Sequence, residues 1–300
     1  MAPHKSHRRD NRRWRHRLAD LAELVRAPAA LSVPGDVLAG AVASGRPLGP
    51  RTLGTMTSSV CLYWAGMALN DYADATLDAV ERPGRPIPSG RVPRRTAFAA
   101  ASALTAAGIG LAAVAGGRRG LGTALPLAGL VWAYDLGLKN TPAGPAAMAG
   151  TRFLDVLAGA RATAPALPAA LVVGLHTYTV TFLSRHETTG APASVPALSL
   201  AGSALAGLGA AATARDGDRA ARVAAVVGAG GYFAAYGSAQ ARAVREPSAA
   251  NVQRAVGAGI LGLMPLQASL TAAAGAPRAA AALAAAHPLA RRLARRVSPT

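Results

Sequence analysis

The chain reads Asn70-Asp71-Tyr72-Ala73-Asp74-Ala75-Thr76-Leu77-Asp78 where a long apolar run ends, and Arg82-Pro83-Gly84-Arg85-Pro86-Ile87-Pro88-Ser89-Gly90-Arg91 follows. If the apolar run is a helix that continues through this stretch, the three aspartates lie on one face. Like charges on one face repel unless a cation lies between them. Carboxylates at this spacing suit Mg²⁺, which usually binds through a few carboxylates and substrate phosphates. The stretch predicts a magnesium site beside a loop that closes over phosphate; the alternative is a solvated helix end with scattered acids.

The charge pattern around this stretch indicates a membrane protein. Of the 300 residues, 51% are hydrophobic and 15% are charged, whereas ordinary globular domains carry roughly 25% charged residues. Four long ranges contain no Asp, Glu, Lys or Arg: 96–117, 188–214, 223–241 and 255–277. Each is close to the roughly 20 residues that cross a bilayer as a helix. Many of these residues are Ala and Gly, so a soluble Ala-rich helical bundle is the alternative fold.

The net charge of +18 and the single cysteine restrict the class further. A strongly basic chain raises nucleic-acid binding as a possibility, but aromatic residues are few and no nucleic-acid-binding motif is present. Much of the basic charge flanks apolar ranges, which favours anionic lipid headgroups as partners. Cys61 lies in an apolar run and predicts neither a disulfide framework nor a cysteine metal site.

The chain divides into three parts. Residues 1–26 form a basic arm without the apolar core of a secretory signal, and residues 277–300 form a basic amphipathic tail that resembles an interfacial helix. Residues 27–276 form an all-α transmembrane domain of about nine spans. Its predicted spans are 27–45, 52–71, 96–117, 120–137, 143–160, 165–183, 192–213, 223–241 and 255–276.

The positive-inside rule predicts the orientation. With an odd number of spans and a cytoplasmic N-terminus, 18 Lys and Arg residues fall on the cytoplasmic side and 13 on the other. The chain is therefore expected to be a multi-pass protein of the plasma (inner) membrane with the Asp-rich stretch in the cytoplasm. The arginines of the 277–300 tail are discordant, since this count places them on the outer side.

Charged residues inside spans are expensive, so each one is a candidate functional residue. Arg152 and Asp155 are three apart and can pair on one helix face, and Asp36 can meet Arg152 across the bundle. Asp135 precedes Lys139 by four, the favourable order for a helix ion pair. A packing ion pair and a substrate contact remain equal alternatives for Arg152. His176, in the middle of a span, is expected to be a hydrogen-bonded packing residue.

The pattern Asn70-Asp71-x-x-Asp74-x-x-x-Asp78, followed by Arg85-Pro86-Ile87-Pro88-Ser89-Gly90, resembles the first Asp-rich motif of the UbiA-type intramembrane prenyltransferase superfamily. The resemblance covers most of residues 20–276. It implies a helical barrel around an apolar cavity, in which Mg²⁺ and the diphosphate of a polyprenyl donor bind. The donor ionises, and a hydrophobic or aromatic acceptor attacks the allylic cation.

The resemblance also implies roles for single residues. Three aspartates would bind Mg²⁺ and act in catalysis: Asp71, Asp74 and Asp78. Five further residues would bind substrate: Asn70, Arg85, Tyr134, Lys139 and Arg152.

One part of the family pattern is altered. The family carries a second Asp-x-x-x-Asp motif at the end of span six, where this chain reads Ser184-Arg185-His186-Glu187. Glu187 alone can replace an aspartate and is the fourth predicted catalytic residue. Arg185 is predicted to bind substrate, because its guanidinium can hold phosphate in place of a metal.

Residues Tyr134, Asp135, Lys139, Arg152 and Arg185 resemble the EboC-like branch of the superfamily, which is associated with secondary metabolism. The sequence predicts a Mg²⁺-dependent membrane prenyltransferase. Two alternatives remain: a non-catalytic relative that binds or transports a lipid-like precursor, and a soluble helical isoprenoid enzyme.

Overall fold

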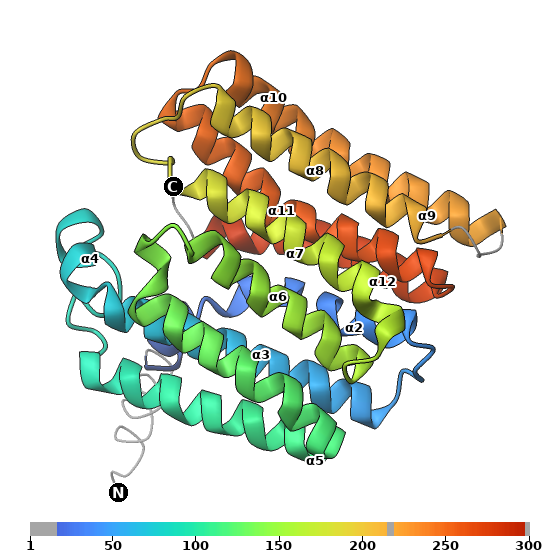
Figure 1. Ribbon diagram of the computed structural model, residues 1–300. Coiled ribbons are helices and arrows are strands. Elements are labelled where there is room, and N and C mark those ends of the chain that lie inside the picture. Colours follow the sequence, from blue (N-terminus) through green and yellow to red (C-terminus); the bar gives the residue numbers. More distant parts are fainter. Residues whose placement is uncertain (1–16, 215–218, 298–300) are drawn as a thin grey trace, which may run out of the picture.

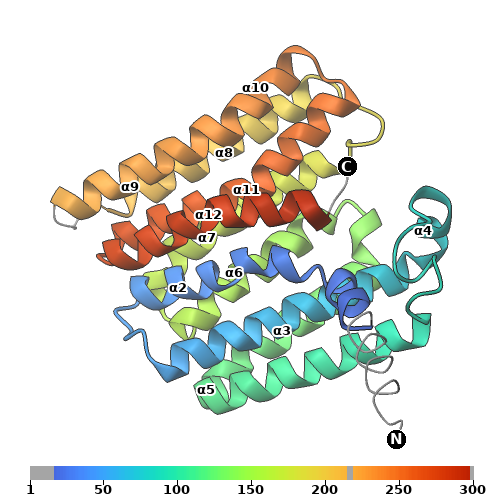
Figure 2. The same cartoon turned by 180° about the vertical axis from the view of Figure 1, so that it is seen from behind.

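The computed structural model describes residues 17–214 and 219–297, and within these ranges the chain is helical without strands. The long helices lie side by side, with α4 at one end of the bundle (Figures 1 and 2). The α-helices are α2 (Pro34–Ala43), α3 (Pro50–Ala73), α4 (Ala75–Glu81), α5 (Arg94–Leu136), α6 (Gly144–Ala160), α7 (Leu167–Ser184), α8 (Ser194–Ala212), α9 (Arg219–Tyr232), α10 (Ser238–Arg245), α11 (Ala249–Ala273) and α12 (Pro277–Val297). Four short turns connect them: η1 (Ala27–Ser32), η2 (Leu138–Asn140), η3 (Ala164–Ala166) and the π-helical η4 (Phe233–Gly237).

Every predicted span falls on helical structure, and the all-α prediction is confirmed for the described residues. Four helical segments there are both long and apolar enough to cross a membrane: Arg94–Leu136, Ala164–Ser184, Ser194–Ala212 and Ala249–Ala273. The range 27–45 differs most from expectation, because it consists of η1 and the ten-residue α2. Pro28 and Pro34 stand at the starts of these two pieces, where proline is best tolerated. The count of nine spans stays a prediction.

Helix α5 accounts for two predicted spans, because it folds back on itself. A straight helix of 43 residues would be about 64 Å long, twice the hydrocarbon thickness of a bilayer. Gly117 breaks it with φ 60° and ψ −142°, a conformation that needs a residue without a Cβ. The two arms then lie together, since the Trp132 indole donates to the Thr105 hydroxyl at 3.0 Å and its ring stands edge-on to Phe98.

Helices α2 and α6 approach so closely that their crossing point requires glycine. A Cβ on Gly40 would lie 1.9 Å from the Val156 carbonyl oxygen, and a Cβ on Gly159 would lie 2.0 Å from that of Val37. Both obstacles are backbone atoms, which cannot move aside as a flexible side chain can. Small residues at such crossings let helix backbones pack directly in membrane proteins.

We expect Gly40→Ala to destabilise the protein by about 3 kcal/mol, the upper range for overpacking, because α2 must move away from α6. Thermal unfolding of the purified protein in detergent measures this. Gly110→Ala is the matched control: its Cβ would meet nothing within 4 Å, and alanine is the better helix former. Equal melting temperatures for the two variants would contradict the close crossing.

His176 is a hydrogen-bonded packing residue, as predicted. Its Nδ1 lies 3.1 Å from the Tyr232 hydroxyl, and both side chains are buried. Close by, the Gln240 amide donates to Ser199 and Ser203 at 2.7 and 2.9 Å. This polar group joins α7, α8, α9 and α10 and fixes their register, because buried donors must find partners where no water is present.

Helix α12 runs along the bundle instead of lying across one end of it. Its first turns, with Ala280 and Leu283, pack in a cluster with α9 and the end of α11, and further along it contacts η1. Figure 2 shows it running along the bundle beside part of α11, whose other end leads towards α10. The predicted helix in 277–300 is therefore present, but it is packed against the domain.

Candidate active site

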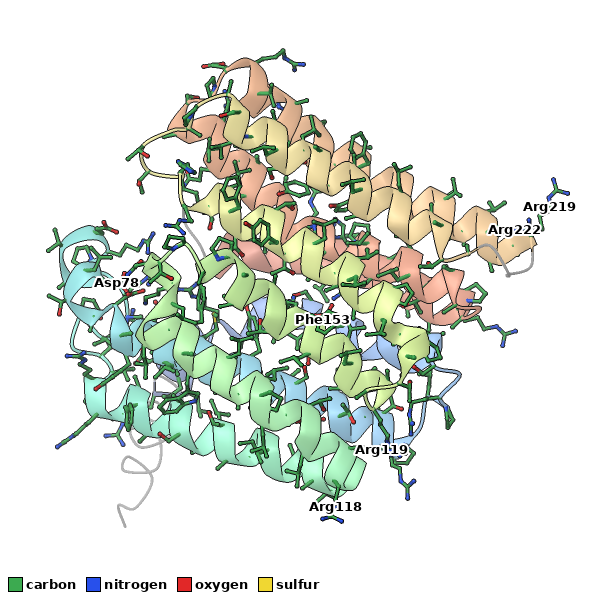
Figure 3. All side chains as sticks on the ribbon, viewed as in Figure 1. Asp78, Arg118, Arg119, Phe153, Arg219 and Arg222 are labelled. Carbon is green, nitrogen blue, oxygen red and sulfur yellow. The ribbon has the colours of Figure 1, made fainter. Side chains whose placement is uncertain are left out.

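A cavity of about 390 Å³ opens inside the bundle, next to the Asp-rich end. Helices α3, α5, α6, α7 and α11 supply its walls. Its lining includes three predicted site residues at the ends of their helices or beyond, namely Asn70, Tyr134 and Glu187. It also includes Tyr63, Arg152 and Asp155, which lie further from the helix ends. Figure 3 shows Asp78 at this end of the molecule and Phe153, from α6, midway along the bundle. A cavity is present as predicted, but it is not purely apolar, because charged and polar side chains share its lining with apolar ones.

The Asp-rich stretch sits on two helices instead of one. Helix α3 ends at Ala73, and Asp74, with φ −87° and ψ 5°, joins it to the seven-residue α4. Asp71 and Asp78 are buried, with 4% and 1% of their surface exposed. They share one partner, Arg85, so these two carboxylates do lie on a common face as predicted.

The loop after α4 returns to this face. Arg85 Nη1 lies 2.6 Å from Asp78 Oδ2 and 3.4 Å from Asp71 Oδ1. The turn that carries it is closed by Ser89, whose hydroxyl donates to the Arg85 carbonyl oxygen at 2.6 Å, and by Gly90 at φ 75°. This explains the Arg-Pro-Ile-Pro-Ser-Gly sequence locally, since glycine adopts positive φ without a steric penalty.

Asp74 binds a different cation. Lys139 Nζ lies 2.5 Å from Asp74 Oδ1. The predicted ion pair between Asp135 and Lys139 is wrong: α5 ends at Leu136 and Lys139 lies in η2, so the helical spacing of four does not apply. Asp135 instead accepts a hydrogen bond from the Asn70 amide at 3.2 Å. Both side chains line the cavity.

The altered second motif borders the same cavity as Asn70. Ser184 and Glu187 line this cavity, whereas Arg185 is exposed and donates to the Thr141 carbonyl oxygen at 2.5 Å. Burial raises the pKa of the Glu187 carboxyl, and the nearby charge of Arg82 opposes that rise. Glu187 is thus the acid of this motif that reaches the cavity.

The inner wall of the cavity contains a buried ion pair. Arg152 Nη1 lies 2.9 Å from Asp36 Oδ2, and the Gln267 amide donates to Asp36 Oδ1 at 2.6 Å. Asp155 does not pair with Arg152; it accepts a hydrogen bond from Ser59. The predicted pair of Arg152 with Asp36 is therefore confirmed, and the predicted pair with Asp155 is wrong. Arg152 fastens α6 to α2 and also lines the cavity.

Two site residues were not predicted from the sequence. Arg26, the last residue of the basic arm, contacts Asp71 at 3.4 Å and lines the cavity. The arm also packs here through Leu24, which is fully buried. Tyr63 lies seven residues before Asn70, which is two helical turns and the same face, so its position was accessible from spacing. Arg26 carried no comparable signal within the sequence.

The donor chemistry at the Asp-rich end fits Mg²⁺, because carboxylate and amide oxygens are the hard ligands that this ion prefers. Within the described ranges, however, no three acidic, histidine or cysteine side chains converge as a ready metal site. Each aspartate is held by cationic side chains instead. Asp71, Asp74 and Asp78 are the residues that would hold a metal–diphosphate group, and the cations around them are suited to its phosphate oxygens.

The comparisons with known proteins agree with this geometry. Residues 33–295 match the model of the UbiA prenyltransferase family. A digeranylgeranylglyceryl phosphate synthase of Methanopyrus kandleri is 43% identical over 118 residues, which cover 39% of this chain and 41% of the relative. The bacteriochlorophyll synthase 34 kDa chain of Chloroflexus aurantiacus is 32% identical over 113 residues, 38% of this chain and 36% of that one. The chain thus spans about two fifths or less of the length of the curated relatives it matches, between 17% and 41%.

Solved structures share the fold over most of the chain. The apo structure of a UbiA homologue from Aeropyrum pernix superposes with a TM-score of 0.64 at 18% identity, covering 80% of this chain and 96% of that one. A structure described for digeranylgeranylglyceryl phosphate synthase in membranes gives 0.63 at 16% identity, covering 86% and 98%. This chain is a multi-pass membrane protein and belongs to the UbiA prenyltransferase family.

Proposed function

We propose that the protein is a Mg²⁺-dependent membrane prenyltransferase that moves an isoprenoid from a polyprenyl diphosphate to an acceptor in the cavity. One observation carries this proposal: three aspartates form ion pairs with four cations (Arg26, Arg82, Arg85 and Lys139) beside a cavity within the bundle. Such an arrangement binds the charged head of a substrate at the mouth of the cavity while the cavity takes its apolar chain.

The ion pairs at the mouth can exchange partners when a substrate binds. When a diphosphate arrives, Arg85 and Lys139 can turn from Asp78 and Asp74 to its oxygens, since guanidinium and ammonium groups bind phosphate strongly. The released carboxylates are then free for Mg²⁺. When bound, Mg²⁺ neutralises the charge that develops on the departing diphosphate. The cavity walls exclude water from the allylic cation.

The acceptor is proposed to be hydrophobic or aromatic. The digeranylgeranylglyceryl phosphate synthases among the relatives add a second class, a glyceryl phosphate. The assignment to the EboC-like branch, and with it a role in secondary metabolism, rests on Tyr134, Asp135, Lys139, Arg152 and Arg185. Of these, Tyr134, Asp135 and Arg152 line the cavity, Lys139 pairs with Asp74, and Arg185 donates to the Thr141 carbonyl oxygen.

We propose that the Asp-rich end faces the cytoplasm of the plasma (inner) membrane. The path of α12 supports this orientation, because it carries the chain from the far end of the bundle back towards η1. Arg291 and Arg292, near the end of α12, then join the basic arm on the cytoplasmic side. The discordance in the positive-inside count disappears with this one extra crossing.

The test uses the purified full chain in nanodiscs with geranylgeranyl diphosphate as the donor. A phenolic acid and a prenylated glyceryl phosphate serve as acceptors in parallel reactions, with Mg²⁺ or with EDTA, and mass spectrometry detects the product. We expect a prenylated product with one acceptor and none with EDTA. Donor that is bound but recovered unchanged with every acceptor would support the alternative of a lipid-binding or transport protein.

A further inference from the structure

The end of the bundle opposite the Asp-rich stretch carries arginines that have no acidic partner among the described residues. Arg118 and Arg119 at the α5 turn and Arg219 and Arg222 on α9 all point outward at this end (Figure 3). Arg46 and Arg51 flank the loop between α2 and α3, Arg161 follows α6, and Arg278 is in the first turn of α12. In the part of the chain that the structure describes, none of these guanidinium groups forms an ion pair.

Four of these arginines converge around the start of α3. Arg161 donates to the Ala115 carbonyl oxygen at 3.0 Å, which ties the end of α6 to the α5 turn. Partial burial and then the charges of Arg46, Arg51 and Arg119 lower the pKa of Arg161. Arg161 also holds a left-handed conformation with φ 52°, which is unfavourable for a residue with a Cβ. Like charges brought together from three separate loops form a site that favours an anion.

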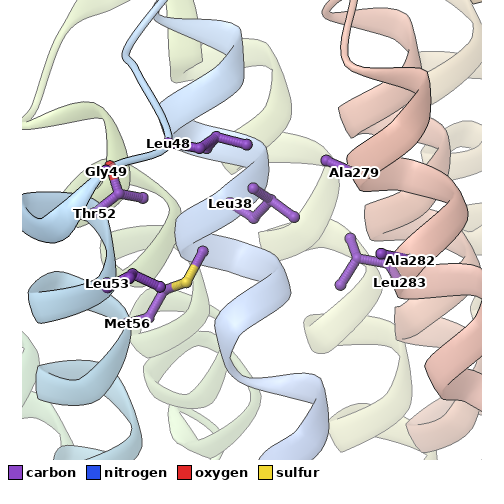
Figure 4. A pocket seen from close by; sticks show the side chains of 9 residues that line it. All are labelled: Leu38, Leu48, Gly49, Thr52, Leu53, Met56, Ala279, Ala282 and Leu283. Atoms are coloured by element: carbon purple, nitrogen blue, oxygen red, sulfur yellow. The ribbon is translucent and has the colours of Figure 1, made fainter.

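An apolar groove opens beside this cluster (Figure 4). Its volume is about 340 Å³. One wall comes from α2 and the start of α3, with Leu38, Leu53 and Met56, and the other comes from α12, with Ala282 and Leu283. Leu53 keeps 62% of its surface exposed. The residues at the groove's end, Leu48, Gly49 and Ala279, are sequence neighbours of Arg46, Arg51 and Arg278.

We propose that this end of the protein binds an anionic phospholipid, with its phosphate between Arg46 and Arg51 and one acyl chain in the groove. The chemistry of the two parts matches the two parts of such a lipid: an unpaired cationic cluster at the level of the membrane surface and an adjoining apolar groove within the bundle. The starts of α3 and α12 also point their positive dipole ends towards the cluster. The bound acyl chain would fill the space between α12 and α3 and hold α12 in place.

The experiment measures binding of phosphatidylglycerol to the purified full chain in detergent by native mass spectrometry, with phosphatidylcholine as the neutral lipid. We expect Arg46→Gln/Arg51→Gln to weaken phosphatidylglycerol binding roughly 30-fold, about fivefold for each arginine near the membrane surface. The matched control, Arg219→Gln/Arg222→Gln, removes the same charge at the same end from α9. It should change binding less than twofold.

A second variant tests the groove without changing charge. Ala282→Phe places a ring in the groove and should weaken phosphatidylglycerol binding while leaving the fold intact by thermal unfolding. Equal losses in the two arginine pairs would overturn the proposal, as would unchanged binding in Ala282→Phe. If inorganic phosphate raises the melting temperature as much as phosphatidylglycerol does, the site binds the headgroup alone and the groove plays no part. That result would also overturn the proposal. A dimer that fails to form in the arginine variant would show that a second copy covers this face.

Discussion

Asp71→Asn should lower kcat for prenyl transfer by about 1,000-fold, the loss expected when about 4 kcal/mol of electrostatic stabilisation is removed from the departing group. Asp71 is 4% exposed and faces both Arg26 and Arg85. Asparagine keeps the shape of the side chain but removes the charge that would hold the metal. The freed guanidinium groups still bind diphosphate, so KM for the donor should rise little. A fall in kcat with little change in KM identifies a group that acts mainly in the transition state.

Glu81→Gln is the control for this prediction. Glu81 lies three residues from Asp78, on the exposed end of α4, and forms no ion pair with the described residues. Removing its charge should leave kcat within twofold of the unchanged protein. Steady-state rates with geranylgeranyl diphosphate measure both variants. An active Asp71→Asn protein, or equal losses in the two variants, would contradict the assignment of the Asp-rich stretch.

The second large effect is on stability. Arg152→Met should destabilise the protein by about 4 kcal/mol, because it leaves the Asp36 carboxylate buried without its cation. Asp36 is fully buried, and among the described residues its carboxylate then keeps only the Gln267 amide as a donor, at 2.6 Å. A loss of this size corresponds to a fall of about 10 °C in melting temperature in detergent.

The double variant Asp36→Leu/Arg152→Met separates a lost interaction from an unpaired charge. Replacing both partners with apolar residues should recover most of the stability, as is common for buried ion pairs. Thermal unfolding of the two single variants and the double variant measures their coupling. If the double variant is less stable than either single one, the pair is not the reason for the loss.

The sequence was sufficient for the local part of the site. The spacing of Asp71 and Asp78 and the position of Arg85 in a Pro/Gly-rich loop predicted a shared face, and these residues do meet. The helical spacing failed for Asp135 and Lys139, because α5 ends at Leu136 between them. Gly137, the C-cap of α5, was the local signal for this helix end, and the predicted span 120–137 already stopped there.

Contacts between distant segments could not be predicted in the same way. Arg26 meets Asp71 across 45 residues, and Gln267 meets Asp36 across 231. Such pairs follow from the order in which helices pack around the cavity. The path of α12 is a similar case: its basic, amphipathic sequence suits a membrane surface, and only its contacts with α9, α11 and η1 show that it runs along the bundle.

The most direct test of the account is the release of inorganic diphosphate from geranylgeranyl diphosphate by the purified full chain. We predict release that requires Mg²⁺, stops with EDTA and is lost in Asp71→Asn but kept in Glu81→Gln. Recovery of intact geranylgeranyl diphosphate from the protein in the presence of Mg²⁺ and acceptor, with no diphosphate released, would contradict the claim that the cavity mouth ionises a prenyl donor.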